Sequence, residues 1–310
     1  MISRKEFLQK ASVFAAGSLL PIGLAATPSI NRSAQDITIL YTNDTHARLD
    51  PFPENANRFA GLGGIAERAA LVEKIRAQHQ HVLLLDAGDV FQGTPWFDVY
   101  GGKVDLRLMT KMKYDAMAVG NHEFDRGPDG FAEAASKAGF PILAANYIVR
   151  NTPLNPFVSR MIIKEFNGFR IGIFGLGIQF DGVVDRLLTG DVRSADPVSN
   201  AIQMVDFLRN SRSCDYIICL SHLGYSYNNG RIDDLGIAER VDGINLIIGG
   251  HTHTFLDAPT VIQKGEDCDT WITQMGHSGV RLGRIDLNLS KSVKAFSTEP
   301  SYYVIGERNL

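Results

Sequence analysis

Side chains that could bind metal ions follow directly after five apolar runs of the sequence. These places read "NDTH" at residues 43–46, "AGD" at 87–89, "NHEFD" at 121–125, His222, and "HTH" at 251–253. Seven of their residues are candidate ligands, each with an oxygen or an imidazole nitrogen and none with a thiolate: Asp44, His46, Asp89, Asn121, His222, His251 and His253. Such a donor set suits Mn, Fe, Zn, Co or Ni better than a structural, cysteine-rich zinc site.

The number of donors indicates two metal ions rather than one. Seven ligands exceed what a single tetrahedral ion needs, whereas a bridging carboxylate would divide them over two ions roughly 3.5–4 Å apart. That arrangement serves in-line displacement at phosphorus. His251 and His253, one residue apart in an extended segment, would point the same way and could serve neighbouring ions.

Each donor alone also has an ordinary structural explanation. Asp44 could cap the turn after its strand, and Gly88-Asp89 could be a simple turn. A single His after a strand, such as His222, is usually a capping or solvated residue. Five such coincidences in one chain are much less expected, which favours the metal site.

The elements that must position these donors alternate between apolar runs and helical patterns, which is typical of an α/β fold with buried strands. Strands are expected at residues 37–42, 81–86, 116–120, 141–146, 170–176, 216–221 and 246–250. Helices are indicated by apolar faces at Ile65, Ala69 and Val72, at Val104, Leu108 and Met112, and at Ile202, Val205 and Leu208. Because ligands bind at the carboxyl ends of strands in open α/β sheets, donors far apart in sequence can converge there.

Two features indicate mixed rather than purely parallel sheets. Asn167-Gly168 lies between apolar runs, which is the strongest short signal for a β-hairpin. Residues 270–275, 281–289 and 301–305 look like strands without intervening helices. No internal repeat, low-complexity linker or composition break marks a second folded domain.

The composition describes a globular chain of 310 residues with 31 basic and 34 acidic residues, a net charge of −3. This length fits one large domain or two small ones. This charge balance does not indicate the excess of positive charge that binding to a nucleic-acid duplex or an anionic membrane requires. Any anionic ligand must therefore be bound by a local group of residues. Cys214, Cys219 and Cys268 indicate no disulfide framework. No function is assigned to His79, His81 or His277.

Residues 1–26 have the pattern of an export signal, with a short basic region, an uncharged stretch and small residues at the end. A membrane anchor needs roughly 20 apolar residues, and this stretch is shorter and contains Pro21, so we expect no stable anchor. Lys5 stands where a twin-arginine signal has its second Arg, which leaves that route and the general secretory route open. We therefore expect a periplasmic protein with a signal at 1–26, a linker at 27–36 and a catalytic domain at 37–310.

The motifs "NDTH", "AGD", "GNHE", "SHLG" and "GGHTH", in this order, resemble those of the calcineurin-like metallophosphoesterases. "LLLDAGDVFQGTPW" and "AVGNHEFDRG" resemble in particular the 5′-nucleotidase and 2′,3′-cyclic phosphodiesterase branch. The resemblance covers about residues 37–289, and the set is highly specific although each motif alone would be weak. It implies a four-layer α/β/β/α sandwich of two mixed sheets flanked by helices.

The resemblance also implies a role for each motif residue. Asp44, His46 and His253 would bind one metal ion, Asn121, His222 and His251 the other, and Asp89 would bridge both. His122 and Asp125 would form a catalytic dyad, the alternative being a merely structural capped turn. Hydroxide bound to the metal ions would attack phosphorus, while His122 would place its imidazolium against the phosphoryl or leaving oxygen.

Two departures from the branch concern the first motif and the substrate. Ala47 stands where the branch commonly has Gly. Branch members also continue into a second domain that supplies aromatic stacking for the nucleobase, and we expect this chain, which ends at Leu310, to lack it. We thus expect the set of catalytic residues to be complete, whereas the residues that determine substrate specificity are not.

We therefore expect an exported phosphoesterase that acts on phosphate esters of the 5′-nucleotide type. A second hypothesis is a catalytic subunit whose nucleotidase C-terminal domain is a separate chain, for which Phe91, Trp96 and Phe97 would offer a docking surface unless they pack under a loop. The motifs also fit a 2′,3′-cyclic phosphodiesterase or a thiosulfohydrolase-like enzyme. A non-catalytic metal-binding module is less favoured, because the pair His122 and Asp125 adds to the ligand set.

Overall fold

The computed structural model describes residues 36–56, 58–264, 269–288 and 301–306. All of them belong to one compact unit that spans Arg32–Leu310. The predicted export signal, most of the predicted linker and Cys268 lie outside the described residues. None of the described helices combines the length and the apolar character that crossing a membrane requires.

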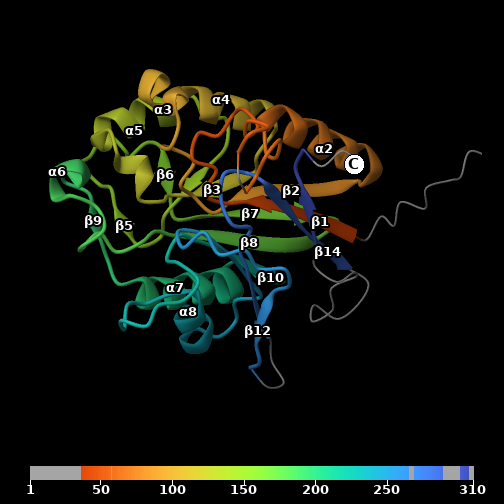
Figure 1. The fold of residues 1–310 in the computed structure, drawn as a ribbon. Helices are drawn as coiled ribbons and strands as arrows, with labels where there is room; N and C mark the ends of the chain where they lie inside the picture. The colour runs from red at the N-terminus through yellow and green to blue at the C-terminus, as the bar shows by residue number, and fades with distance from the viewer. Residues whose placement is uncertain (1–35, 57, 265–268, 289–300, 307–310) are drawn as a thin grey trace, which may run out of the picture. The chain divides into compact units, whose positions relative to one another are not determined.

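Helices and strands alternate along most of the chain (Figure 1). The strands are β1 (Asp36–Thr42), β2 (His81–Asp86), β3 (Ala116–Ala118), β4 (Ile142–Leu143), β5 (Tyr147–Ile148), β6 (Val158–Ser159), β7 (Met161–Phe166), β8 (Phe169–Leu176), β9 (Arg193–Ser194), β10 (Tyr216–Ser221), β11 (Leu246–Gly249), β12 (Thr260–Ile262), β13 (Thr270–Thr273), β14 (Arg281–Asn288) and β15 (Ser301–Val304). The helices are α2 (Ile65–Gln78), α3 (Pro95–Tyr100), α4 (Lys103–Lys111), α5 (Gly127–Ala135), α6 (Arg186–Thr189), α7 (Pro197–Asp206) and α8 (Asp234–Arg240), with the 3₁₀ helix η1 (His122–Phe124) and the π-helical segment η2 (Phe207–Ser211).

Within the described ranges, two large sheets form the centre of the fold. The first has the strand order β15-β14-β1-β2-β3-β4-β6 and the second β12-β13-β11-β10-β8-β7. Antiparallel strands occur at the β14–β15 side of the first sheet and at both edges of the second, and the other pairings are parallel. The prediction of mixed sheets is therefore confirmed. Between β7 and β8, Asn167 and Gly168 have φ of 51° and 84°, as a type I′ hairpin turn requires.

Alternate residues of the strands build three packed clusters, because successive side chains of a strand point to opposite faces. Ile37 and Ile39 of β1 pack against Ile218 of β10, between the two sheets. Leu40 of β1 faces the opposite way, into a cluster with α2, α4 and α5. Cys219 of β10 faces α7 and α8 in a third cluster. Figure 1 shows α2 to α5 on one side of the sheets and α7 and α8 on the other, which confirms the four-layer α/β/β/α sandwich.

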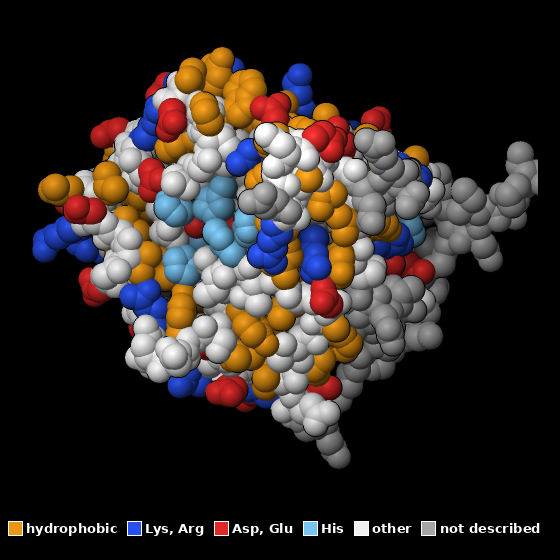
Figure 2. Space-filling view, in the orientation of Figure 1, with side chains coloured by type: hydrophobic (Ala, Val, Ile, Leu, Met, Phe, Trp, Pro, Cys, Tyr) orange, Lys and Arg blue, Asp and Glu red, His pale blue; other side chains and the backbone are white. Residues whose placement is uncertain are grey.

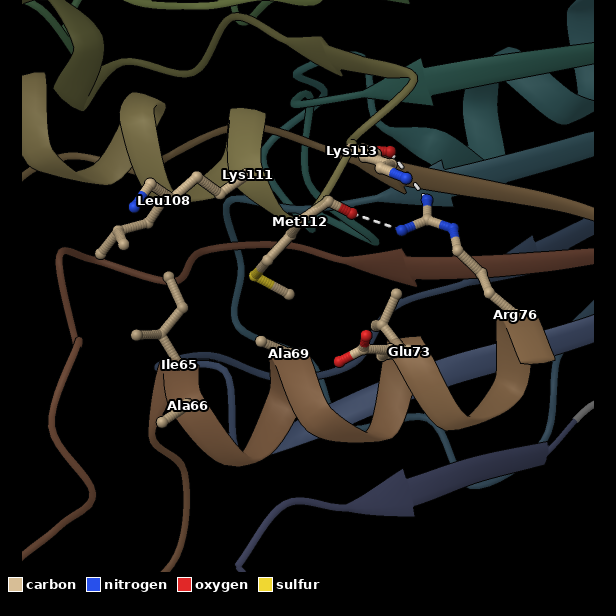
Figure 3. A pocket seen from close by; sticks show the side chains of 10 residues that line it. Ile65, Ala66, Ala69, Glu73, Arg76, Leu108, Lys111, Met112 and Lys113 are labelled. Carbon is tan, nitrogen blue, oxygen red and sulfur yellow. Dashed lines mark hydrogen bonds between the residues drawn. The ribbon is translucent and has the colours of Figure 1, made fainter. Parts of the chain in front are cut away.

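Residues of the predicted apolar faces of α2 and α4 line a pocket between the two helices (Figure 3), although Val72 and Met112 of these faces also belong to the buried core. Ile65 and Ala69 of α2 and Leu108 and Met112 of α4 line this pocket, whose volume is about 390 Å³. Arg76 donates hydrogen bonds to the backbone carbonyls of Met112 and Lys113 at one end of it. The residues that the two helices bury most include Leu71, Val72, Ile75, Leu106 and Met109. Periodicity thus predicted the positions of the two helices, but it predicted only part of the face that each helix buries against the sheet.

The buried face of α7 is rotated from the predicted one. Ala201, Met204 and Val205 are buried, whereas Ile202 is 49% exposed. At 3.6 residues per turn, Ile202 and Leu208 lie about 120° apart around a helix, so they do not share a narrow face. Ala201, Val205 and Leu208 follow the i, i+4, i+7 spacing of a buried stripe.

The prediction of a docking surface at residues 91–97 is wrong for two of its three aromatic residues. Phe91 and Phe97 are only 1% and 6% exposed, and their rings contact each other at 5.6 Å in the cluster beneath the helices. Pro95 begins α3 at its first turn, and the helical twist carries Phe97 inward. Trp96 instead stacks on Tyr100 on the outer side, at 5.7 Å.

Candidate metal centre

The five motifs lie at the carboxyl ends of parallel strands from both sheets. β1, β2 and β3 lead to Asp44, Asp89 and Asn121, and β10 and β11 lead to His222 and the segment 251–253. A register of parallel strands aligns their carboxyl ends at one edge of a sheet, and the packing of the two sheets places both edges together. Figure 2 shows histidine side chains gathered on one face of the molecule.

The described residues contain two groups of three side chains whose donor atoms lie within 4.8 Å of one another: Asp44, His46 and His253, and Asp89, His222 and His251. In the first group, His253 Nε2 lies 2.9 Å from His46 Nε2 and 3.3 Å from Asp44 Oδ1. In the second group, His222 Nε2 lies 3.0 Å from Asp89 Oδ2. Asn121 Oδ1 lies 2.7 Å from His251 Nδ1. The structure therefore brings all seven sequence-predicted donors together.

Asp44 connects the two groups. Its Oδ1 lies 3.9 Å from His46 Nε2 in the first group and 3.9 Å from His222 Nε2 in the second. The Asp89 carboxylate faces His222 through Oδ2, and its Oδ1 accepts the backbone N–H of His122 at 2.8 Å. A bridging role for Asp89 stays a prediction.

Five of the seven donors have a left-handed backbone, with φ of 50° at Asp44, 50° at His46, 55° at Asp89, 71° at His251 and 54° at His253. For residues other than glycine this conformation costs on the order of 1–2 kcal/mol each. Backbone hydrogen bonds hold two of them in place, from Asp44 to the Gly88 carbonyl at 2.9 Å and from His46 to the Asp89 carbonyl at 3.1 Å. Strain of this kind gathers at binding and catalytic sites, where surrounding contacts maintain it.

The same backbone shows why glycine is favoured at the position of Ala47. Ala47 has φ of 47°, a conformation that favours glycine, and its backbone N–H is held by the Val90 carbonyl at 2.7 Å. Glycine is required at Gly120, where an added Cβ would lie 2.2 Å from Asp89 Oδ1. Gly120 thus allows the ends of β2 and β3 to approach closely enough for Asp89 and Asn121 to share one site.

Two histidines are held through Nδ1, which directs Nε2 into the centre. His222 Nδ1 lies 2.7 Å from the Ala87 carbonyl, and His46 Nδ1 lies 3.1 Å from the Phe91 carbonyl. Because a carbonyl only accepts hydrogen bonds, Nδ1 carries the proton and Nε2 of the neutral ring keeps its lone pair. His222 Nε2 is buried and has no hydrogen bond of good geometry, although Asp89 is close. The Nε2 atoms of both rings thus face into the centre, as binding of a divalent cation requires.

Burial and charge oppose each other in the pKa values of this centre. Burial alone would lower the pKa of His222, but the charges of Asp89 and Asp44 outweigh it and raise that pKa to about 10. Burial would raise the pKa of Asp89, yet the charge of His222 holds it well below its ordinary value. Burial, then the positive charge of His222, lowers the pKa of His251 to about 4. The buried carboxylates thus favour positive charge, which a metal ion can supply in place of a proton.

His122 and Asp125 form a pair beside the centre. η1 places them three residues apart, with His122 Nδ1 2.9 Å from Asp125 Oδ2 and 3.1 Å from Oδ1. The ring of His122 lies 5.4 Å from that of His46, and about a third of its side chain is exposed. Burial would lower the pKa of His122, but the hydrogen bond to Asp125 and the charge of Asp89 raise it above its ordinary value. The pair can therefore present a protonated imidazole to a bound anion.

Glu123 lies within the motif at residues 121–125 and joins the loops of the site, a role that its place in the sequence did not predict. It is 1% exposed, and its carboxylate accepts backbone N–H groups from Gly120 at 2.6 Å, Val90 at 2.9 Å and Asp89 at 3.1 Å. These bonds join the loops after β2 and β3. A buried carboxylate needs hydrogen-bond donors around it. An acidic residue within a metal-binding motif therefore indicates a position where it accepts hydrogen bonds from the neighbouring loops.

Three histidines outside the motifs are placed differently. His79 lies against Arg284 and His81 against Phe166, at the amino end of β2 and therefore away from the centre. His277 instead lies at the centre, where its ring contacts that of His253 at 5.0 Å. His277 follows the strand predicted at residues 270–275, which allows it to approach the centre, but it belongs to none of the five motifs.

The chain is similar to known proteins over most of the described fold. Residues 37–255 match the family described as calcineurin-like phosphoesterase. A snake venom 5′-nucleotidase from Crotalus adamanteus is 34% identical over 248 residues, which cover 76% of this chain and 40% of that protein. A 5′-nucleotidase from Homo sapiens is 35% identical over 252 residues, which cover 77% and 41%.

A solved structure supports the same relationship. The structure of a 5′-nucleotidase precursor from Thermus thermophilus superposes with a TM-score of 0.77 at 32% identity, covering 87% of this chain and 54% of that one. The chain thus spans about two fifths of the length of the curated relatives it matches, and about half of this solved chain.

Proposed function

Because the chain belongs to the calcineurin-like phosphoesterase family, we propose that it uses two divalent metal ions to hydrolyse phosphate esters of the 5′-nucleotide type. The broader activity, that of a metal-dependent phosphoesterase of the 5′-nucleotidase family, follows from the family match and from relatives at 34% and 35% identity. The observation that carries the finer proposal is the junction of the two donor groups, in which Asp44 Oδ1 lies 3.9 Å from a histidine of each.

The proposed ligands are divided between the ions as the motifs suggest. Asp44, His46 and His253 would hold one ion, Asn121, His222 and His251 would hold the other, and Asp89 would serve both. The oxygen and imidazole donors suit Mn, Zn, Fe, Co or Ni. When bound, such ions activate water for attack on phosphorus and neutralise the phosphoryl oxygens.

His122 and Asp125 are the proposed catalytic dyad. The protonated imidazole of His122 donates a hydrogen bond to a phosphoryl oxygen or to the leaving oxygen, where negative charge develops. Asp125, 2.9 Å from Nδ1, fixes the orientation of the ring and supports its positive charge. The buried Asp89, which accepts the backbone N–H of His122 at 2.8 Å, holds the base of that side chain beside the metal centre.

Export, domain order and a partner chain form a second part of the proposal. We propose that residues 1–26 direct the chain to the periplasm, that 27–36 are a linker and that 37–310 are the catalytic domain. The relatives extend well beyond the matched region, since 248 matched residues are 40% of the venom protein. A separate chain that contributes to substrate binding is the last part of this proposal. N-terminal sequencing of the protein recovered from a periplasmic fraction tests the first statement, and intact residues 1–26 in the cytoplasm would contradict it.

Phosphate release by the purified, metal-loaded chain tests the activity. Adenosine 5′-monophosphate, adenosine 2′,3′-cyclic monophosphate and thiosulfate conjugates should be compared under the same conditions, with the ring-opened monophosphate measured for the cyclic ester and sulfate measured for the thiosulfate conjugates. The proposal predicts release from the 5′-monophosphate that stops after chelation of the metal and returns when metal is restored. A preference for the cyclic ester or for the thiosulfate ester would replace it with the corresponding activity. Comparing the chain with and without a co-purified partner tests the contribution of a second chain.

A further inference from the structure

A row of aromatic rings continues from the metal centre across the neighbouring loops. The His277 ring lies against the ring of His253, with centroids 5.0 Å apart and planes inclined by 31°. His277 also contacts Phe59 at 5.4 Å and Phe255 at 5.7 Å, and these two rings lie 5.8 Å apart. We call His277, Phe59 and Phe255 the ring row. All three are partly exposed, so the row extends the metal centre along the surface.

The backbone that carries His277 is tied to the same strand end as Asp44. The Asn43 side chain donates to the Gly276 carbonyl at 2.6 Å, and the backbone N–H of Ser278 donates to the Asp44 carbonyl at 2.7 Å. These bonds lie on both sides of His277. The position of the first ring in the row is therefore set by the backbone that also sets a proposed metal ligand.

Burial of the core does not explain the ring row. Phe59 and Phe255 belong to none of the three packed clusters of the described residues, and they are not among the partly buried hydrophobic residues that pack against those clusters. Aromatic rings that are partly exposed and outside the core are typical of ligand-binding surfaces, where they offer large contact area with little loss of side-chain freedom.

Positive charge borders the ring row. The guanidinium of Arg58 lies 4.9 Å from the centre of the Phe59 ring and 5.3 Å from that of Phe255. Arg281 lies 4.9 Å from the Phe255 ring and pairs with Asp257 at 2.9 Å. Figure 2 shows Lys or Arg side chains and hydrophobic side chains directly beside the histidines on this face. Rings flanked by guanidinium groups suit a flat, electron-rich partner.

We propose that the ring row, with Arg58 over two of its rings, is a subsite of this chain for a flat aromatic group on the leaving side of the phosphate ester, such as a nucleobase. The inference rests on the proposed function, because a phosphate at the metal centre would place its leaving group next to the row. Stacking on aromatic side chains is tolerant of base identity, since every base has a π-face. The subsite therefore selects esters with an aromatic leaving group over sugar phosphates, and discriminates little among bases.

Two ligands that differ only in the base test this subsite. Adenosine 5′-monophosphate and ribose 5-phosphate are titrated into metal-loaded His122→Ala protein by isothermal titration calorimetry, so that slow turnover does not consume them. The variants Phe59→Leu and Phe255→Leu are made in the same background. Phe166→Leu is the matched control, because this ring contacts His81 at the far end of the sheets. Metal content and melting temperature are measured for every variant.

The subsite predicts that the parent binds adenosine 5′-monophosphate about tenfold more tightly than ribose 5-phosphate, the scale of one stacked base. Phe59→Leu and Phe255→Leu should reduce this ratio to about threefold or less while the affinity for ribose 5-phosphate and the metal content stay unchanged. Phe166→Leu should keep the parental ratio. Equal affinities in the parent, or an equal loss for both ligands in the variants, would overturn the subsite.

The outcomes also separate this inference from the proposed function. If the native chain releases phosphate from both esters with equal efficiency and binds them equally, the proposed activity stands and the subsite is wrong. If the metal-loaded chain neither binds nor hydrolyses either ester, both are wrong. Tight binding of the nucleotide that Phe59→Leu weakens selectively supports both together.

Discussion

His122 Nδ1 lies 2.9 Å from Asp125 Oδ2 in the same turn that delivers Asn121 to the metal centre. The pair adjoins the proposed ligands without belonging to either donor group. We therefore expect His122→Ala to keep a normal metal content and to lower kcat by about two orders of magnitude, the scale of positioned acid catalysis. Metal analysis and phosphate-release kinetics check both parts, with His79→Ala as the control. Loss of metal from His122→Ala would make His122 a ligand instead.

Asp89→Asn tests the proposed bridge. Replacing a bridging carboxylate with an amide removes a ligand and a negative charge from two ions at once, so we expect both ions to be depleted after dialysis. Elemental analysis of the dialysed variant against the parent measures this. A variant that keeps both ions would contradict the bridge, and the loss of a single ion would assign Asp89 to the second group alone.

Glu123→Gln tests how the loops after β2 and β3 are held together. The carboxylate accepts several backbone N–H groups, and an amide would turn donors toward some of them. Leaving such buried groups unsatisfied should lower the free energy of unfolding by about 2–4 kcal/mol and should weaken metal binding through Asp89. Urea denaturation measures the first effect. The exposed Glu133→Gln is the matched control and should leave stability unchanged, whereas unchanged stability in Glu123→Gln would refute the role.

The contribution of Asp105 to the stability of the fold should fall as the pH rises from about 4 to 7. Asp105 is 2% exposed, and burial raises its pKa to about 7 in the folded state. Between its unfolded and folded pKa the native state binds the extra proton, so ionisation at higher pH favours unfolding. Asp105→Asn removes this dependence, so the stability of the variant relative to the parent should increase as the pH rises. The increase should be at most about 4 kcal/mol, because each unit of pKa shift corresponds to about 1.4 kcal/mol. Thermal or urea unfolding at pH 4.5, 6 and 7.5 measures the difference, and a constant difference would contradict it.

The architecture and the convergence of the donors could be predicted because they depend on simple repeated patterns. Apolar runs such as that of β1 end at the same sheet edge when the strands are parallel, so a polar residue after each run is placed without knowledge of the loops. The order of the motifs then supplied the resemblance. Asn167-Gly168 predicted its hairpin for an equally local reason, since both positions require a positive φ.

Other features depend on packing that no local pattern records. The inward rotation of Phe97 follows from the start of α3 at Pro95, and the exposure of Ile202 follows from which side of α7 meets the sheet. The segment that carries His277 to its contact with His253 is held by hydrogen bonds between residues more than 200 positions apart, such as that from Asn43 to Gly276.

Anomalous X-ray diffraction from crystals of the metal-loaded chain, recorded at the absorption edge of the bound metal, is the decisive experiment for the proposed pair of ions. We expect two peaks roughly 3.5–4 Å apart, one beside Asp44, His46 and His253 and the other beside Asn121, His222 and His251. A single peak, or peaks that avoid these side chains, would contradict the two-ion centre.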